Sequence, residues 1–234
     1  MAFAGDTNVT SGSAELSNNK AEAIAHIIRK RVREPIKRVL VVGCGSGLEA
    51  AILARELGSE VVGVDLFSTF DPVVARLVDL RRGDATALEF KEGAFDFVYS
   101  YHALEHIPAY QQALGEMKRV LADGGSYCVG TPNRSRIVGY LGSNDATIRQ
   151  KIAWNFADWR ARARGKFRNE YGAHAGFTAG ELRNDLQRVF SQVDEISLPY
   201  YQQVYSRHER LITVLDRSGL GRFIFPSVYF MGRK

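Results

Sequence analysis

The sequence predicts an α/β fold, a Rossmann-like and doubly wound sheet of seven mostly parallel strands, and three observations support this prediction. Short apolar runs alternate with amphipathic stretches between residues 38 and 133. A glycine-rich turn, GCGSG at residues 43–47, directly follows the first apolar run. Two strand-like pieces near the C-terminus can pair antiparallel at one sheet edge. Such alternation is typical of parallel sheets covered by helices on both faces.

Length and composition fit a single domain over residues 1–234, since 45% of the 234 residues are hydrophobic. The two cysteines, Cys44 and Cys128, make no disulfide framework, and we expect them to be small buried fillers in a reducing compartment. The first twenty residues lack the basic and apolar regions of a secretory signal. No apolar run reaches the roughly 20 residues that cross a bilayer. These features predict a cytoplasmic protein.

The formal net charge of +5 is only a weak indication of an acidic partner. Basic residues are spread along the chain rather than clustered in one stretch. Proteins that bind nucleic acid usually concentrate their positive charge in a patch or stripe. Charge alone therefore makes nucleic-acid binding a minor hypothesis.

Strands and helices are expected in alternation through the first half of the chain. Apolar runs predict strands at 38–42, 60–65, within 77–84, at 95–101 and at 124–133. Helical spacing predicts helices at 21–32, 47–57 and 109–121, and Asp71-Pro72 marks the start of a short helix. Residues 1–18 are small and polar, and we expect a mobile segment there.

The rhythm changes after Asn133. Residues 146–168 form one long helix candidate with an apolar stripe: Ile148, Ile152, Phe156, Trp159 and Ala163. A capping box, Thr178 with Glu181, starts another helix that reaches about residue 190. A helix near 206–216 and strand-like pieces at 192–198 and 227–232 complete the chain. Segment 134–177 is thus a helical insertion after the fifth strand.

The glycine turn indicates a ligand site, because glycine lets the backbone turn sharply and approach a ligand closely. Its spacing is G-x-G-x-G, whereas a dinucleotide site has G-x-G-x-x-G, and Leu48 occupies the position of that last glycine. This argues against an NAD-dependent oxidoreductase. Asp65 ends the second strand, where a carboxylate can accept both ribose hydroxyls. Asp84 ends the third strand and can accept a hydrogen bond from an adenine amino group.

The successive motifs of residues 37–190 resemble those of class I S-adenosylmethionine-dependent methyltransferases. The resemblance rests on "VLVVGCGSG", "GVD", "GDATALEF", "FDFVYSYHALEHI", "EMKRVLADGGSYCVGTPN" and "HAGFTAGEL". The subgroup that the chain resembles most is the small-molecule type, known as methyltransferase type 11, which includes ubiquinone-pathway O-methyltransferases. The motif series is specific for the class and poorly specific for the substrate.

The resemblance implies S-adenosylmethionine as the cofactor and a set of residues that bind it. The glycines would pass under the methionine part, Asp65 would bind the ribose, and the next side chain would pack on the adenine. Asp84 and its neighbour would hold the adenine edge, and the residues after the fourth strand would border the methionine end. The implied set is Gly43, Gly45, Gly47, Asp65, Leu66, Asp84, Ala85, Tyr101 and His102. One departure concerns Val41, at a position where the family usually has an acidic residue.

Two histidines are candidate general bases. His106 follows the fourth strand, at the carboxyl end where parallel sheets place their sites. His174 lies in "EYGAHAGFT", at a position that often carries a site histidine in the resembling family. Glu105 either orients a histidine or forms a structural ion pair, and we favour the structural role. His102 is expected to be a wall of the cofactor pocket.

The function that follows from the resemblance is methyl transfer to a small-molecule or lipid-like acceptor, at oxygen. A nucleic-acid methyltransferase and a non-catalytic cofactor-binding subunit remain alternatives, although the Asp/Asn-Pro-Pro-aromatic motif of base-amino methyltransferases is missing after residue 101. Residues 134–177, together with the first twenty residues, are expected to cover the acceptor pocket as a lid. A homodimer would be the other explanation for the apolar stripe. No metal site is expected.

Overall fold

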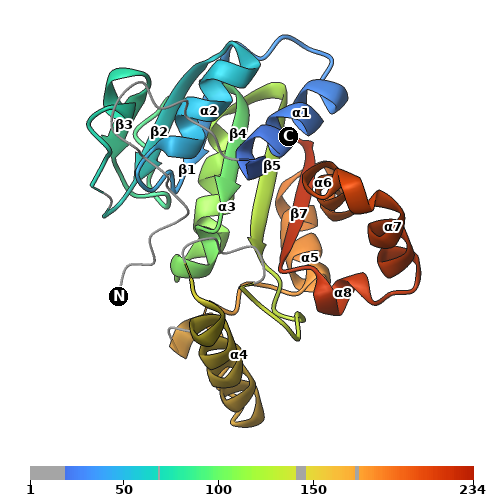
Figure 1. The fold of residues 1–234 in the computed structure, drawn as a ribbon. Coiled ribbons are helices and arrows are strands. Elements are labelled where there is room, and N and C mark those ends of the chain that lie inside the picture. The colour runs from blue at the N-terminus through green and yellow to red at the C-terminus, as the bar shows by residue number, and fades with distance from the viewer. Residues whose placement is uncertain (1–18, 68, 141–145, 172–173) are drawn as a thin grey trace.

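The computed structural model describes residues 19–67, 69–140, 146–171 and 174–234. The segment expected to be mobile, residues 1–18, lies outside the described residues. The strands are β1 Arg38–Val42, β2 Glu60–Asp65, β3 Asp79–Arg82, β4 Phe95–Tyr101, β5 Leu121–Pro132, β6 Gln192–Glu195 and β7 Ser227–Arg233. They form a seven-stranded sheet in the order β3-β2-β1-β4-β5-β7-β6 (Figure 1).

The strand pairings confirm the predicted fold class. β3, β2, β1, β4 and β5 run parallel to one another. β7 pairs antiparallel with both β5 and β6, so the predicted antiparallel pair lies at the edge of the sheet. Because the first five strands are parallel, the loops that follow them emerge at one common edge.

Helices cover both faces of the sheet, as Figure 1 shows. The helices are α1 Asn19–Arg31, α2 Leu48–Leu57, α3 Tyr110–Val120, α4 Ile148–Ala163, α5 Ala179–Val189, α6 Ser197–Val204, α7 Glu209–Arg217 and α8 Gly221–Ile224. Short 3-10 turns lie at Val74–Arg76, Leu104–His106, Asn169–Tyr171 and Ser206–His208. No helix within the described ranges combines the length and the apolar character needed to cross a bilayer.

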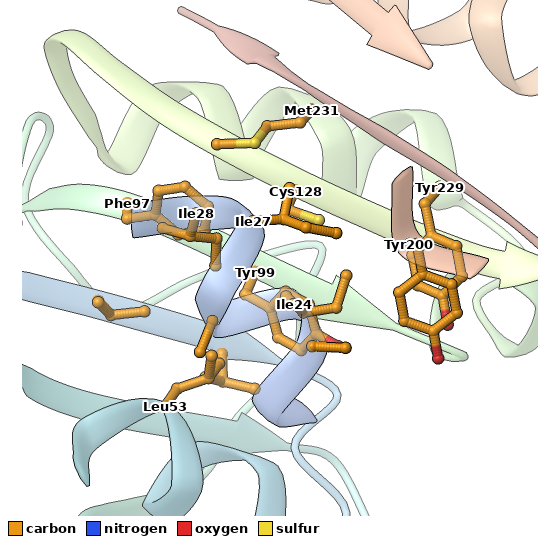
Figure 2. Packing of buried hydrophobic residues seen from close by; sticks show 14 of the residues in the cluster. Ile24, Ile27, Ile28, Leu53, Phe97, Tyr99, Cys128, Tyr200, Tyr229 and Met231 are labelled. Atoms are coloured by element: carbon orange, nitrogen blue, oxygen red, sulfur yellow. The ribbon is translucent and has the colours of Figure 1, made fainter. Parts of the chain in front are cut away.

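The residue alternation of the strands explains the two covered faces. In β1, Val39 and Val41 join the apolar cluster under α1, α2 and α6, whereas Leu40 and Val42 join the cluster under α3 and α5. Successive strand side chains point to opposite faces, so an uninterrupted apolar run buries both. Figure 2 shows the first cluster, in which Ile24 of α1 lies beside Tyr99 of β4 and Ile28 lies beside Phe97.

The structure differs from the element predictions in a few places. The Asp71 carboxylate caps a 3-10 turn at Val74–Arg76, accepting from the Val73 and Val74 amides, rather than a short α-helix. α4 ends at Ala163, before the predicted residue 168, because Gly165 adopts a left-handed conformation. The sequence reasoning missed α6 and α8, which are short, and α6 also contains Pro199.

Most of the apolar stripe of α4 is exposed, although the Trp159 Nε1 donates to the Ile137 carbonyl (2.7 Å). Ile148, Ile152, Phe156 and Trp159 are 76%, 62%, 65% and 45% exposed. The opposite side of the helix is held by polar groups. Asn155 exchanges hydrogen bonds with the backbone of Gly139 (2.7 and 3.1 Å), and Arg162 donates to the carbonyls of Arg134 and Arg136 (2.7 Å each). Helix α4 is therefore held by polar contacts, to which the stripe contributes the Trp159 indole.

Gly176 fixes the return of the insertion to the sheet. The Phe177 amide donates to the Pro132 carbonyl at the end of β5 (3.0 Å), and a Cβ on Gly176 would lie 1.9 Å from that same oxygen. Gly176 also has φ +69°, where a side chain is strained. Only glycine fits at this junction, which carries His174 two residues earlier.

Substitution Gly176→Ala should lower the free energy of unfolding by more than about 2 kcal/mol, since left-handed strain alone costs roughly 1–2 kcal/mol and the steric overlap adds to it. The control is Gly115→Ala, in the exposed middle of α3 with open space around it. That change should stabilise by about 1 kcal/mol. Urea denaturation of both variants measures the difference, and equal stabilities would contradict the packing described for Gly176.

Candidate functional site

The glycine turn occupies the centre of the carboxyl edge of the sheet. Gly43, Gly45 and Gly47 all have positive φ, at 73°, 56° and 96°. The amides of Gly43 and Cys44 both donate to the Val64 carbonyl of β2, at 2.8 and 3.1 Å. A Cβ on Gly43 would lie 2.2 Å from the Cβ of Ala103, which follows β4, whereas one on Gly45 would meet open space. The turn is thus held between β2 and β4, with its Gly45 side open.

Asp65 joins the glycine turn to the loop after β2. Its Oδ2 accepts from the Gly45 amide (3.0 Å) and its Oδ1 accepts from the Phe67 amide (3.1 Å). The predicted adenine contact, Leu66, is 44% exposed beside it. The Asp65 carboxylate therefore orders both the glycine turn and the loop after β2. The structure therefore brings together Asp65 and the glycines as the sequence predicted.

Asp84 has a local role in the structure. Its Oδ1 accepts from the amide and the hydroxyl of Thr86, both at 2.8 Å, and these bonds lower the pKa of the carboxyl. Ala85 is half-buried and packs against the cluster under α3 and α5. Both residues lie directly after β3, at the same edge as Asp65, whose backbone pairs with Arg82. The recorded bonds of Asp84 stay within its own turn.

Tyr101 and His102 end β4 and stack on each other, with ring centroids 4.0 Å apart. His102 has φ 51°, an uncommon conformation for a side chain of this size, and its Nε2 lies 3.0 Å from the Ser227 hydroxyl of β7. Loss of hydration and the nearby Lys20 charge keep the pKa of His102 well below its ordinary value. Tyr101 also stacks on Tyr229 of β7 (5.5 Å). These rings form a wall between β4 and β7.

The two candidate bases lie side by side. The rings of His106 and His174 are 4.6 Å apart, edge to face, although 68 positions separate them in the sequence. Burial lowers the pKa of both imidazoles, and for His174 the neighbouring His106 and Arg136 lower it further. Asp65 partly offsets this for His106. These effects favour the neutral form of both imidazoles.

Glu105 lies beneath this pair. Its side chain is fully buried, and Oε1 lies 3.9 Å from the His106 Nε2. Neither carboxylate oxygen has a hydrogen-bond partner among the described residues, and burial raises the pKa of Glu105 to about 8. Donor atoms of Glu105, His106 and His174 all lie within 4.8 Å of one another. A carboxylate with two imidazoles is also a donor set that holds divalent transition metals.

Arg136 positions His174, and the sequence reasoning missed it. The guanidinium is buried and donates to the carbonyls of His174 (2.9 Å) and Asn133 (3.1 Å), with Asp158 of α4 at 3.5 Å. Arginine is rarely fully buried without such partners. Its role depends on three segments that meet only in the folded chain, so no local pattern in the sequence indicates it.

Known proteins that are similar to this chain include methyltransferases. The family described as "Methyltransferase domain" matches residues 40–129. Demethylmenaquinone methyltransferase from Thermus thermophilus is 38% identical over 101 residues, covering 40% of this chain and 46% of the relative. Tocopherol O-methyltransferase from Arabidopsis thaliana is 30% identical over 120 residues, covering 46% of this chain and 33% of the relative. The chain thus spans less than half the length of these relatives.

A solved structure extends the likeness in fold to nearly the whole chain. The SAM-dependent methyltransferase from Thermotoga maritima aligns with 92% of this chain and 89% of its own, with a TM-score of 0.56 and 19% identity. The family match covers the glycine turn, Asp65, Asp84, His102 and His106. Residues 40–129 therefore match a methyltransferase domain, and nearly the whole chain shares its fold with a solved SAM-dependent methyltransferase.

Proposed function

We propose that the chain transfers a methyl group from S-adenosylmethionine to an oxygen atom of a small-molecule or lipid-like acceptor. The observation that carries the proposal is the junction of the Asp65-linked glycine turn with the histidine pair at one sheet edge. The cofactor supplies an electrophilic methyl group on its sulfonium. The chain's own residues bind the cofactor, align the acceptor and take up its proton.

Cofactor binding is assigned to the loops after β1, β2, β3 and β4. The open side of Gly45 would allow the methionine part to lie against the backbone, and the Asp65 carboxylate beside it would accept from the ribose hydroxyls. Leu66 has an exposed apolar side chain that would pack on the adenine, and Asp84 and Ala85 would hold its edge. The stacked rings of Tyr101 and His102 would border the methionine part of the cofactor.

Proton removal is assigned to His106, with His174 as its neighbour. An alcohol or phenol must lose its proton as the new C–O bond forms, and a neutral imidazole is suited to accept it. Because burial favours the neutral form of both histidines, either ring can act without first being deprotonated. The need for such a base is what favours oxygen as the methylated atom.

A lipid-like acceptor is supported by the relatives and by α4. The two relatives are named for demethylmenaquinone and tocopherol, both lipid-soluble molecules. The exposed stripe of α4 adjoins the exposed cations Arg149, Arg160 and Arg164. Asp158, the acidic residue of this helix, faces Arg136 instead. An apolar face flanked by cations suits an anionic lipid surface.

The insertion is assigned the role of a cover over the acceptor. Residues 134–177 leave the sheet at Pro132 and return beside it through Phe177, and they bring His174 against His106. A cover excludes water and helps to align the acceptor. In this arrangement the inner side of the insertion faces the acceptor and the stripe of α4 contacts the surface from which the acceptor comes. The alternative is that a second copy of the chain covers the stripe in a homodimer.

Cofactor binding can be tested by calorimetric titration with S-adenosylhomocysteine. Substitution Asp65→Ala should weaken binding by about 1–3 kcal/mol, because the ribose hydroxyls lose their acceptor. The control Asp79→Ala, on β3 and paired with Arg81 at 2.6 Å, should leave the affinity unchanged. Tight binding of NAD together with no response to S-adenosylhomocysteine would refute the assignment.

Base catalysis can be tested with an acceptor found by screening lipid-soluble phenols and alcohols for methylation. Substitution His106→Ala should lower turnover by roughly 10²–10⁴-fold and leave the affinity for S-adenosylhomocysteine nearly intact. His174→Ala should have the smaller effect if His106 is the base. Unchanged turnover in His106→Ala would reduce this histidine to a structural role and transfer the proposal to His174.

Surface binding can be tested by sedimentation with lipid vesicles. The protein should bind vesicles that contain phosphatidylglycerol more than vesicles of phosphatidylcholine, and Phe156→Glu should reduce this binding severalfold. Leu211→Glu, at an exposed position of α7, is the control. Absence of vesicle binding, combined with a dimer in gel filtration that Phe156→Glu converts to a monomer, would assign the stripe to a second copy.

A further inference from the structure

The family's usual acidic residue is missing from the end of β1. Val41 stands at that position, 2% exposed, and belongs to the apolar cluster under α1 and α2. Its neighbour in the sheet is Tyr99 of β4, since the register pairs these two residues. Paired residues of adjacent parallel strands point to the same face of the sheet. An acid that replaced the missing one would have to reach the region above Val41 and Tyr99.

Glu49 reaches this region from the helix instead of the strand. It lies in the first turn of α2, two residues after Gly47, and its carboxylate accepts a hydrogen bond from the Tyr99 hydroxyl. Tyr99 itself lies beneath α1, beside Ile24 (Figure 2). The position is also favourable for a negative charge, because the first turn of a helix presents unpaired amides. Glu49 thus brings a carboxylate to the neighbour of Val41, directly beside the glycine turn.

An opposite charge lies close to Glu49. Lys20, in the first turn of α1, lowers the pKa of the Glu49 carboxyl, and its charge also reaches Tyr101 and His102. The ammonium of Lys20 therefore lies within electrostatic reach of the residues that end β4. The starts of α1 and α2 are in contact through Ala21 and Leu48, so this carboxylate and this ammonium come from neighbouring helix ends.

We propose that Glu49 and Lys20 form the site for the amino-acid end of the cofactor, with Glu49 binding its α-ammonium group and Lys20 facing its carboxylate. This inference rests on the proposed function, since it assigns residues to one part of the same cofactor. It also explains why position 41 needs no acidic residue. The carboxylate comes from α2, which follows the glycine turn, instead of from β1, which precedes it.

The charge balance of the site agrees with this assignment. Burial raises the pKa of Glu49 to about 7, and the hydrogen bond from Tyr99 and the charge of Lys20 only partly oppose that effect. A ligand that brings an ammonium group to the carboxylate would stabilise its ionised form. A zwitterionic amino acid supplies both charges that the pair would complement, so binding adds no net charge to a partly buried site.

The test compares two ligands that differ only in the amino-acid part. S-adenosylhomocysteine carries it, and 5′-methylthioadenosine has the same adenosine thioether without it. In calorimetric titrations, Glu49→Gln should weaken S-adenosylhomocysteine about tenfold or more and change the affinity for methylthioadenosine less than twofold. Lys20→Met should show the same selectivity. The control is Glu56→Gln, which lies on the same helix and faces Arg29 and Arg55.

Each outcome separates this inference from the proposed function. If the unaltered chain binds neither ligand, the proposed function fails. If it binds S-adenosylhomocysteine and Glu49→Gln binds it equally well, the assignment of Glu49 alone is overturned. Equal weakening of both ligands in Glu49→Gln also overturns the assignment, because it would show a structural role for Glu49 in holding the glycine turn. Thermal melting of each variant establishes that the titrated protein is folded.

Discussion

The hydrogen bonds between the glycine turn and the end of β2 are the interaction on which the site depends. Three successive amides, from Gly43, Cys44 and Gly45, are directed to the Val64 carbonyl and the Asp65 carboxylate. This arrangement requires positive φ in the turn and the close approach of Ala103 after β4. Because the turn is held on both sides, the start of α2 and its Glu49 are placed relative to β4. The helices and strands that follow place their functional side chains around the glycine turn.

The second constraint is the return of the insertion to the sheet. The contact between Phe177 and Pro132 allows only glycine at position 176, and it sets His174 against His106. Arg136 then fixes the His174 carbonyl and faces Asp158 of α4. The buried Arg136 guanidinium therefore links the histidine pair to α4, the helix that carries the exposed stripe. This explains how a helix outside the sheet can be held rigidly while its apolar face stays open.

The sequence predicted the central strands β1, β2 and β4 because they are buried on both faces and read as nearly uninterrupted apolar runs. β1, β2 and β4 have the predicted bounds, and the capping box of Thr178 and Glu181 starts α5 as expected. The adjacency of Asp65 and the glycine turn was also predictable, since both follow parallel neighbouring strands. Helix α6 was not, because its buried Tyr200 and Tyr201 pack against distant β7 and Phe225 rather than following a long helical period.

Other features depend on contacts between distant segments and leave no local signal. The apolar stripe of α4 was predicted, but its exposure was not, since periodicity shows that a face is apolar without showing what covers it. Arg136 and Glu49 resemble ordinary surface residues in the sequence, and only the folded chain brings them to His174 and Tyr99. The two candidate general bases come from the loop after β4 and from the insertion. The sequence can indicate each histidine separately, but it does not show that the two rings are in contact.

The central claim is that the carboxyl edge around the glycine turn is the cofactor site, and a crystal structure with S-adenosylhomocysteine tests it most directly. The account predicts density along Gly45, with the ribose hydroxyls at the Asp65 carboxylate, the adenine against Leu66 and the amino-acid end between Glu49 and Lys20. Ligand density elsewhere on the molecule, with the Gly45 side of the turn closed by the chain's own side chains, would contradict it.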